Sequence, residues 1–186
     1  EEHTLDIGIG RLPVKTAEEA TAVVDKIIQY DTSKKSMGRW RKQIVFVADD
    51  GSISDGFTSL HQAQANQLAI TNEETNPAID SRKIFLGTYK KNIEPGGESI
   101  PAVNQKILET FDRGALIINY TGHGGERIWA DENIFSDFDI EELENERYPF
   151  LVTATCEFGR HDVPNSISGA ELTVTREKSG SIGILT

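Results

Sequence analysis

The sequence predicts an α/β protein with a doubly wound, mostly parallel sheet and helices on both faces. The first observation is a set of apolar, β-rich runs that are continuous rather than alternating, as in strands covered on both faces. The second is that helical patterns separate these runs, so that strand and helix alternate along the chain. The strand runs are 43–50, 83–89, 115–122, 149–156 and 181–186, and the main helical patterns are 58–70, 102–114 and 168–180.

Local signals support these elements. In the helix expected at 102–114, Ile107, Leu108 and Phe111 have the spacing of one buried face, and Gly114 stands where a C-cap belongs. Between the third and fourth strands, residues 137–149 favour only a short acidic helix.

The first forty residues read differently from this core. Residues 6–16 resemble a strand and 17–31 an amphipathic helix, with Thr16 and Glu19 spaced for a capping box. The basic stretch 33–42 looks like a linker. We therefore expect residues 1–40 to be the end of a preceding subdomain and 41–186 to be the core. The last residues, "SGSIGILT", stop within an apparent buried strand, so the core is expected to be incomplete.

The charge, the cysteine count and the motifs of the chain narrow the classes of function that it can have. The chain has 186 residues and a net charge of -11, so nucleic acid and anionic membrane are unfavourable partners. No apolar run reaches the ~18–20 residues of a membrane span, and no signal peptide is visible. Cys156 is the single cysteine, which excludes an intrachain disulfide. Nucleotide and serine-hydrolase motifs (G-x-x-x-x-G-K-[ST], G-x-G-x-x-G and G-x-S-x-G) are absent from the sequence.

Two reactive side chains follow successive strands. His123 lies in "NYTGHGG" after the third strand, and Cys156 closes the fourth in "LVTATCEFG". The carboxyl ends of parallel strands meet at one rim, where ligands bind. Neighbouring strands would bring together a cysteine nucleophile and a histidine base. The backbone N–H groups of Gly124 and Cys156 could then form an oxyanion hole, and the glycines around His123 would let a substrate carbonyl approach.

Two longer segments resemble a known family. "NYTGHGGERIWADENIF" and "PFLVTATCEFGRHDVPNSISGAELTV", together with "DIGIGRLPVKT", are similar to the gingipain-like cysteine peptidases. The resemblance implies a caspase-like fold, with His123 as general base and acid and Cys156 as nucleophile. Within the family, "CEFGRHDVPNSISGAE" most resembles the C-terminal signal peptidase of the type IX secretion system, a surface sortase.

That resemblance implies a specific activity. Such an enzyme removes C-terminal sorting domains from secreted cargo through a thioester, and can transfer the cargo to an amine of anionic lipopolysaccharide. The implied partners are those sorting domains, that lipopolysaccharide and other outer-membrane components of the secretion system, at the bacterial cell surface. The alternatives are a gingipain-type protease of broader specificity and a non-catalytic caspase-like binding module.

The sequence leaves the roles of the other candidate site residues open. A residue that orients His123 could be one of several acids, each of which could equally be a solvated loop residue. Trp129 and Glu157 are candidates to line the substrate cleft, although Trp129 could instead pack the loop. His161 could join Cys156 and His123 at zinc, but no paired ligand motif supports a metal site. No cofactor is expected, while structural calcium is an option, for which 49–56 departs from an EF-hand. The candidate orienting acids are Glu126, Asp131, Glu132 and the pair Asp49 and Asp50.

Overall fold

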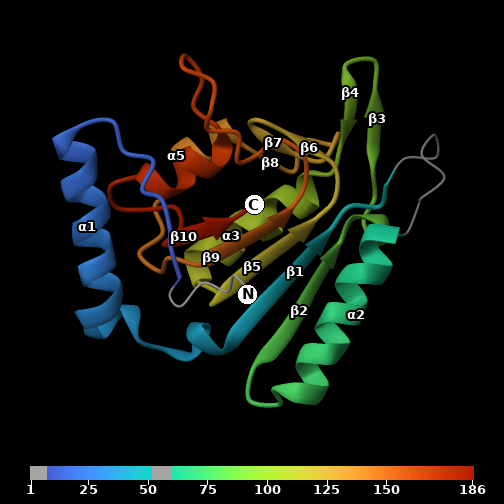
Figure 1. Cartoon of the computed structure of the whole chain (residues 1–186). Coiled ribbons are helices and arrows are strands. Elements are labelled where there is room, and N and C mark those ends of the chain that lie inside the picture. Colours follow the sequence, from blue (N-terminus) through green and yellow to red (C-terminus); the bar gives the residue numbers. More distant parts are fainter. Residues whose placement is uncertain (1–7, 52–59) are drawn as a thin grey trace, which may run out of the picture.

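The computed structural model describes residues 8–51 and 60–186, and its centre is a parallel sheet of five strands in the order β10-β9-β5-β1-β2. Every pairing in this sheet is parallel, and helices cover both faces, as the sequence predicts (Figure 1). The fold is therefore the expected α/β class. The strands are β1 (Gln43–Ala48), β2 (Asp80–Phe85), β5 (Ile117–Thr121), β9 (Phe150–Ala154) and β10 (Gly183–Leu185).

The sheet separates two layers of helices. On one face, α3 (Pro101–Arg113) packs Val103, Ile107 and Phe111 into the main apolar core, which includes alternate residues of β1 and β5. On the other face, α2 (Leu60–Thr75) contacts β1 and β2 and buries the small side chains of Ala65 and Ala69. Figure 1 shows α2 in front of the sheet and α3 behind it. Gly114 ends α3 with φ of 82°, in agreement with the predicted C-cap.

The second strand begins earlier than its apolar pattern indicates. Its first residues, Asp80–Arg82, are polar because β2 is an edge strand and is not covered like the central ones. The predicted continuation to residue 89 is wrong, since Leu86–Thr88 forms a 3₁₀ turn. Leu86 itself remains buried in the core.

The N-terminal helix α1 (Ala17–Thr32) is capped by the Thr16 side chain, which accepts from the N–H of Glu19. The reciprocal bond of a capping box goes instead from Lys15 N–H to Glu19. No strand forms at 8–15, where Pro13 lacks an N–H; residues 6–7 lie outside the described ranges. The predicted linker contains two 3₁₀ turns, Lys34–Ser36 and Arg39–Lys42.

Helix α1 packs on α5 (Gly169–Thr175) through a buried lysine. Nζ of Lys26 donates to the carbonyls of Val174, Arg176 and Ser179 at 2.7, 2.8 and 3.2 Å. Burial and the nearby Arg176 cation lower the pKa of Lys26 to about 8. These bonds join the first forty residues to the sheet-covering helix α5, while the domain boundary near residue 40 stays a prediction.

The structure also contains two small antiparallel sheets that the sequence did not predict. One is a hairpin of β3 (Asn92–Glu94) and β4 (Gly97–Ser99). The other has three strands, β6 (Gly124–Gly125), β7 (Ile128–Trp129) and β8 (Phe135–Ser136). The acidic helix α4 (Asp137–Glu141) is as short as expected, and Ser136 and Asp139 close its capping box. Within the described ranges, none of the helices has the length and apolarity needed to cross a bilayer.

Candidate active site

The register of the sheet brings three strand ends together. Strand β5 lies between β1 and β9, with Thr121 paired to Ala48 on one side and to Ala154 on the other. Asp49 follows β1 directly, and His123 and Cys156 each lie two residues beyond their paired strand ends. Histidine is thus placed between a carboxylate strand and a cysteine strand at a single rim.

Asp49 holds both the ring and the backbone of His123. Its Oδ2 lies 2.7 Å from Nδ1 of the imidazole and accepts from the backbone N–H of His123 at 2.9 Å. Oδ1 accepts from the N–H of Gly51 at 3.0 Å. The side chain of Asp49 is only 4% exposed, so these bonds form in a largely water-free setting.

The charge of Asp49 decides the tautomer of His123. Burial raises the pKa of Asp49, but the bonds from the backbone of His123 and Gly51 and from the imidazole outweigh burial and place the pKa below its ordinary value. The carboxylate is therefore anionic and can only accept. Nδ1 must then donate, so in a neutral His123 the ring nitrogen that can accept a proton is Nε2.

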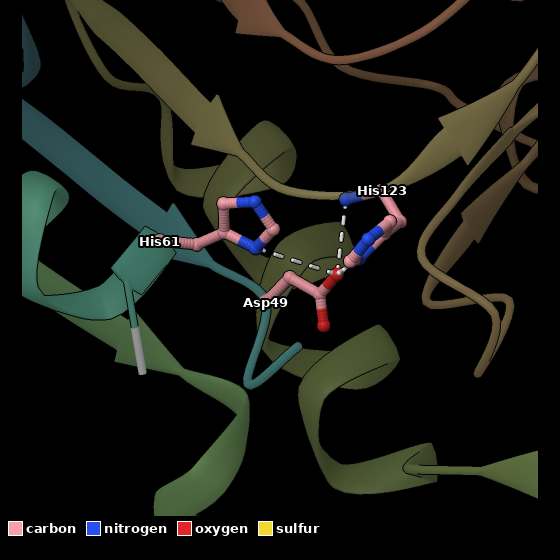
Figure 2. A group of neighbouring side chains, drawn as sticks. All are labelled: Asp49, His61 and His123. Carbon is pink, nitrogen blue, oxygen red and sulfur yellow. Dashed lines mark hydrogen bonds and ion pairs between the residues drawn. The ribbon is translucent and has the colours of Figure 1, made fainter. Parts of the chain in front are cut away.

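A second imidazole, which the sequence reasoning missed, faces the same carboxylate. His61, at the start of α2, lies with Nδ1 3.9 Å from Oδ2 of Asp49, and its ring meets that of His123 edge-on at 4.9 Å between centroids. Figure 2 shows Asp49 between the two histidines. The helix that follows β1 starts at the rim where β1 ends, so a histidine in its first turn lies close to that rim. This position in the sequence could have indicated His61 as a site residue.

Cys156 lies on a sharp, exposed turn. Its carbonyl accepts from the N–H of Phe158 at 2.7 Å, and Glu157 between them has φ of 58°, the left-handed region that non-glycine residues rarely adopt. The cysteine is exposed. A thiol presented on a constrained turn at a sheet rim is accessible to a bulky substrate.

The backbone at Gly124 suits an oxyanion-binding role. Ala130 N–H donates to the carbonyl of His123, which makes Gly124 and Trp129 a non-hydrogen-bonded pair of the β6–β7 ladder. In such a pair the ladder does not use the N–H of Gly124. A Cβ at Gly124 would lie 2.5 Å from Oγ1 of Thr155, which places this glycine directly against the residue that precedes Cys156.

Gly122, directly before His123, is required by the protein's own packing. A Cβ at Gly122 would come within 2.3 Å of Cβ of Asp49 and 2.6 Å of the Tyr120 hydroxyl. Gly122 therefore makes room for Asp49, the acid that bonds His123. The sequence alone indicated only substrate access as a reason for glycine here.

The other candidate acids have different partners. Glu126 accepts from Arg160 at 3.1 Å and so ties the loop after Cys156 to the histidine loop. Glu132 and Asp50 both pair with the ammonium of Lys91, while Asp131 is exposed. Of the predicted candidates, Asp49 alone contacts the ring of His123 among the described residues.

The two residues suggested for the substrate cleft differ. Trp129 has no exposed surface; its ring stacks on Tyr120 at 4.6 Å and packs on Phe135 and Phe158. Of the two roles expected for Trp129, the structure shows packing and not the lining of a cleft, because the large apolar ring is buried in the core. Glu157 is exposed beside Cys156 and pairs with Arg160 at 3.5 Å.

The metal options can be tested against the donor groups. His161 is exposed and lies 3.2 Å from the carbonyl of Gly159, and the two clusters of metal-ligand type among the described residues include neither His161 nor Cys156. In one cluster, Asp49, Asp50 and Glu132, the Lys91 ammonium pairs with the carboxylates of Asp50 and Glu132, where a calcium ion would have to compete with it. Residues 52–56 of the loop considered for calcium lie outside the described ranges.

A parallel α/β sheet with Asp, His and Cys on three adjacent strand ends defines the layout of an α/β cysteine peptidase. The chain belongs to peptidase family C25, whose model matches residues 1–186. It is 24% identical over 158 residues to Gingipain R2 and to Gingipain R1 of Porphyromonas gingivalis. These matches cover 83% of this chain, which spans 19% and 14% of the two relatives.

Solved structures show the same fold. The Arg-specific cysteine proteinase gingipain R matches with a TM-score of 0.68 at 22% identity, over 92% of this chain and 37% of that one. The complex of the pro- and mature domains of Porphyromonas gingivalis RgpB matches with a TM-score of 0.70 at 21% identity, over 97% and 40%. The caspase-like fold expected from the resemblance is therefore confirmed.

Proposed function

We propose that this chain contains the catalytic centre of a cysteine peptidase, with Cys156 as nucleophile, His123 as base and acid, and Asp49 as the residue that positions His123. The observation that carries the proposal is the bond between Asp49 and Nδ1 of His123, because it leaves Nε2 as a proton acceptor on the strand next to Cys156. Membership of peptidase family C25 supports the same activity.

The chemistry follows from these roles. Nε2 of His123 takes the thiol proton, and Sγ of Cys156 attacks the scissile carbonyl carbon. The carbonyl oxygen becomes an oxyanion, to which the N–H groups of Gly124 and Cys156 donate. The C–N bond then breaks, the imidazolium gives its proton to the leaving amine, and a thioester to Cys156 remains.

The thioester can be resolved in two ways. Water attacks with His123 again as base, which gives a carboxylic acid and the free thiol. Alternatively an amine attacks and loses its proton to His123, which gives a new amide and the free thiol. Both routes use the same residues, so hydrolysis and transpeptidation depend on which acceptor reaches the rim.

We infer the more specific role from the sequence around Cys156, which resembles the type IX signal peptidases of the PorU type. The substrate would be a cargo protein with a C-terminal sorting domain, and the acceptor an amine of anionic lipopolysaccharide at the bacterial cell surface. The exposure of Cys156 supports this, because an acyl group on an open rim is accessible to a bulky amine.

Trapping the acyl-enzyme tests the proposal. The purified protein is incubated with a peptide that spans a cargo junction, quenched in acid and measured by mass spectrometry. We expect a thioester adduct on Cys156 in the wild type and none in Cys156→Ala, with adduct formation retained in the exposed-site control His161→Ala. Turnover of the peptide by Cys156→Ala would contradict a cysteine peptidase.

Adding an amine separates the sortase from a hydrolytic protease. With an amino sugar in excess, the sortase yields an amide of the cargo segment, while a gingipain-type protease of broad specificity yields the free acid and also cuts peptides unrelated to cargo. Binding of the junction peptide without any adduct would favour the non-catalytic module and contradict the proposal.

A further inference from the structure

We propose that Asp49, His61 and His123 form a binding site for a divalent transition metal such as Zn²⁺, and that the bound metal switches off His123 as a base. The effect on catalysis rests on the proposed function, whereas the binding site itself does not. The metal binds on the Nδ1 side of His123, which faces Asp49 (Figure 2).

The donor atoms are already gathered. One ligand atom from each of the three residues lies within 4.8 Å of the others. Oδ2 of Asp49 lies 2.7 Å from Nδ1 of His123 and 3.9 Å from Nδ1 of His61. Ligands of tetrahedral zinc, at about 2.0–2.2 Å from the metal, stand roughly 3.3 Å apart. To reach this spacing, the distance from Asp49 Oδ2 to Nδ1 of His123 has to lengthen by about half an ångström. The distance from Asp49 Oδ2 to Nδ1 of His61 has to shorten by about the same amount.

The donor types select the metal. Two imidazole nitrogens and one carboxylate oxygen suit Zn²⁺, Cu²⁺ or Ni²⁺, whereas Ca²⁺ and Mg²⁺ prefer sites made of oxygen. The three residues come from the end of β1, the first turn of α2 and the loop after β5. Because α2 contacts β1 and β5, the ligands are held by packed elements.

His61 carries the second, independent observation. Its Nδ1 is buried and has no hydrogen-bond partner among the described residues, although it faces the buried carboxylate of Asp49. At 3.9 Å a proton on this nitrogen is too far to bond, and without a proton its lone pair points toward an anionic oxygen. A cation between the two atoms satisfies both, and an unpartnered buried group is a recognised sign of such an ion.

The metal changes the tautomer of His123. In its absence Nδ1 holds the proton and Nε2 is the acceptor. When a metal binds Nδ1, the proton of the neutral imidazole moves to Nε2, and Nε2 can no longer accept the thiol proton of Cys156. The metal also takes Oδ2 of Asp49 from its bond with the ring. No covalent bond is made or broken, so removing the metal restores the base.

Calorimetric titration of Zn²⁺ into the purified Cys156→Ala protein tests the site without any contribution from the thiol. We expect one Zn²⁺ per chain and at least a tenfold weaker affinity in the double variant that adds His61→Gln. The matched control adds His161→Gln, which removes an exposed histidine outside the cluster and leaves the affinity unchanged. Melting curves without metal verify that the variants are folded.

Co²⁺ as a spectroscopic probe identifies the ligands. Binding at the proposed site gives visible d–d bands without a thiolate-to-cobalt charge-transfer band, and His61→Gln removes them. A charge-transfer band that vanishes in Cys156→Ala would place the metal on the thiol and overturn the proposal, as would affinity that does not respond to His61→Gln. If binding behaves as expected while Cys156 forms no acyl adduct, the metal site stands and the proposed function fails.

Discussion

Oδ2 of Asp49 accepts from both the ring and the backbone N–H of His123, at 2.7 and 2.9 Å. A single carboxylate oxygen thus fixes both the imidazole and the loop that carries it. Because the strand ends of β1 and β5 are in register, the sheet sets the positions of Asp49 and of the loop that carries His123.

Asp49→Asn tests the positioning role. The amide can present N–H to Nδ1 and favour the wrong tautomer, so we expect the rate of acyl-enzyme formation to fall about 10²–10⁴-fold, as is typical when the acid of a triad becomes an amide. Single-turnover kinetics measure the rate, and a shift of its pH profile separates positioning from loss of fold. Asp131→Asn, at an exposed rim acid, is the control, and an equal loss in both variants would contradict the role.

Gly122→Ala tests the contact between the histidine loop and Asp49. The added methyl group would lie 2.3 Å from Cβ of Asp49, so we expect loss of activity and a free energy of unfolding lower by about 1–3 kcal/mol. The matched control is Gly125→Ala, where the nearest atom lies 3.7 Å away. Urea unfolding and single-turnover rates distinguish the two, and equal behaviour would refute the packing role of Gly122.

Lys26→Met tests whether α1 is part of the same folding unit as the sheet. Methionine keeps the apolar stem but leaves three carbonyls near the end of α5 without their donor. We expect a loss of about 1–3 kcal/mol in the free energy of unfolding and a single cooperative transition. Lys178→Met, at an exposed lysine, should change little. An unaltered stability of Lys26→Met would instead support an independent N-terminal subdomain.

Acid should remove the contribution of Asp49 to stability. Its pKa in the folded protein lies below the ordinary value of 3.8, so the folded state binds fewer protons than the unfolded state. The stabilisation is therefore present above about pH 4 and is lost as the pH falls through the folded pKa. We expect the difference in unfolding free energy between wild type and Asp49→Asn to be smaller at pH 3 than at pH 5. No change between pH 5 and 3 would argue against a lowered pKa.

The sequence was sufficient for the strands of the core and for the shared rim of His123 and Cys156. Continuous apolar runs identify covered strands, and parallel strands place their carboxyl ends together. The start of β2 was missed because an edge strand keeps polar residues that carry no apolar pattern. The small sheet after His123 was missed because two-residue strands leave no periodicity.

The choice of Asp49 among the candidate acids needed the structure. It depends on the register between β1 and β5, which are separated by 74 residues at the contact, and no local pattern encodes that pairing. The same holds for Trp129, since its burial results from stacking on Tyr120 and not from its position in the motif.

The rate of Cys156 alkylation tests the central claim most directly. The rate of reaction with iodoacetamide at pH 7 is measured by mass spectrometry in wild type, in His123→Ala and in the exposed-site control His161→Ala. If His123 is the base for Cys156, the wild type and His161→Ala react at the same rate and His123→Ala reacts more slowly, because the imidazole no longer takes up the thiol proton. Equal rates in wild type and His123→Ala would contradict the pairing of His123 with Cys156.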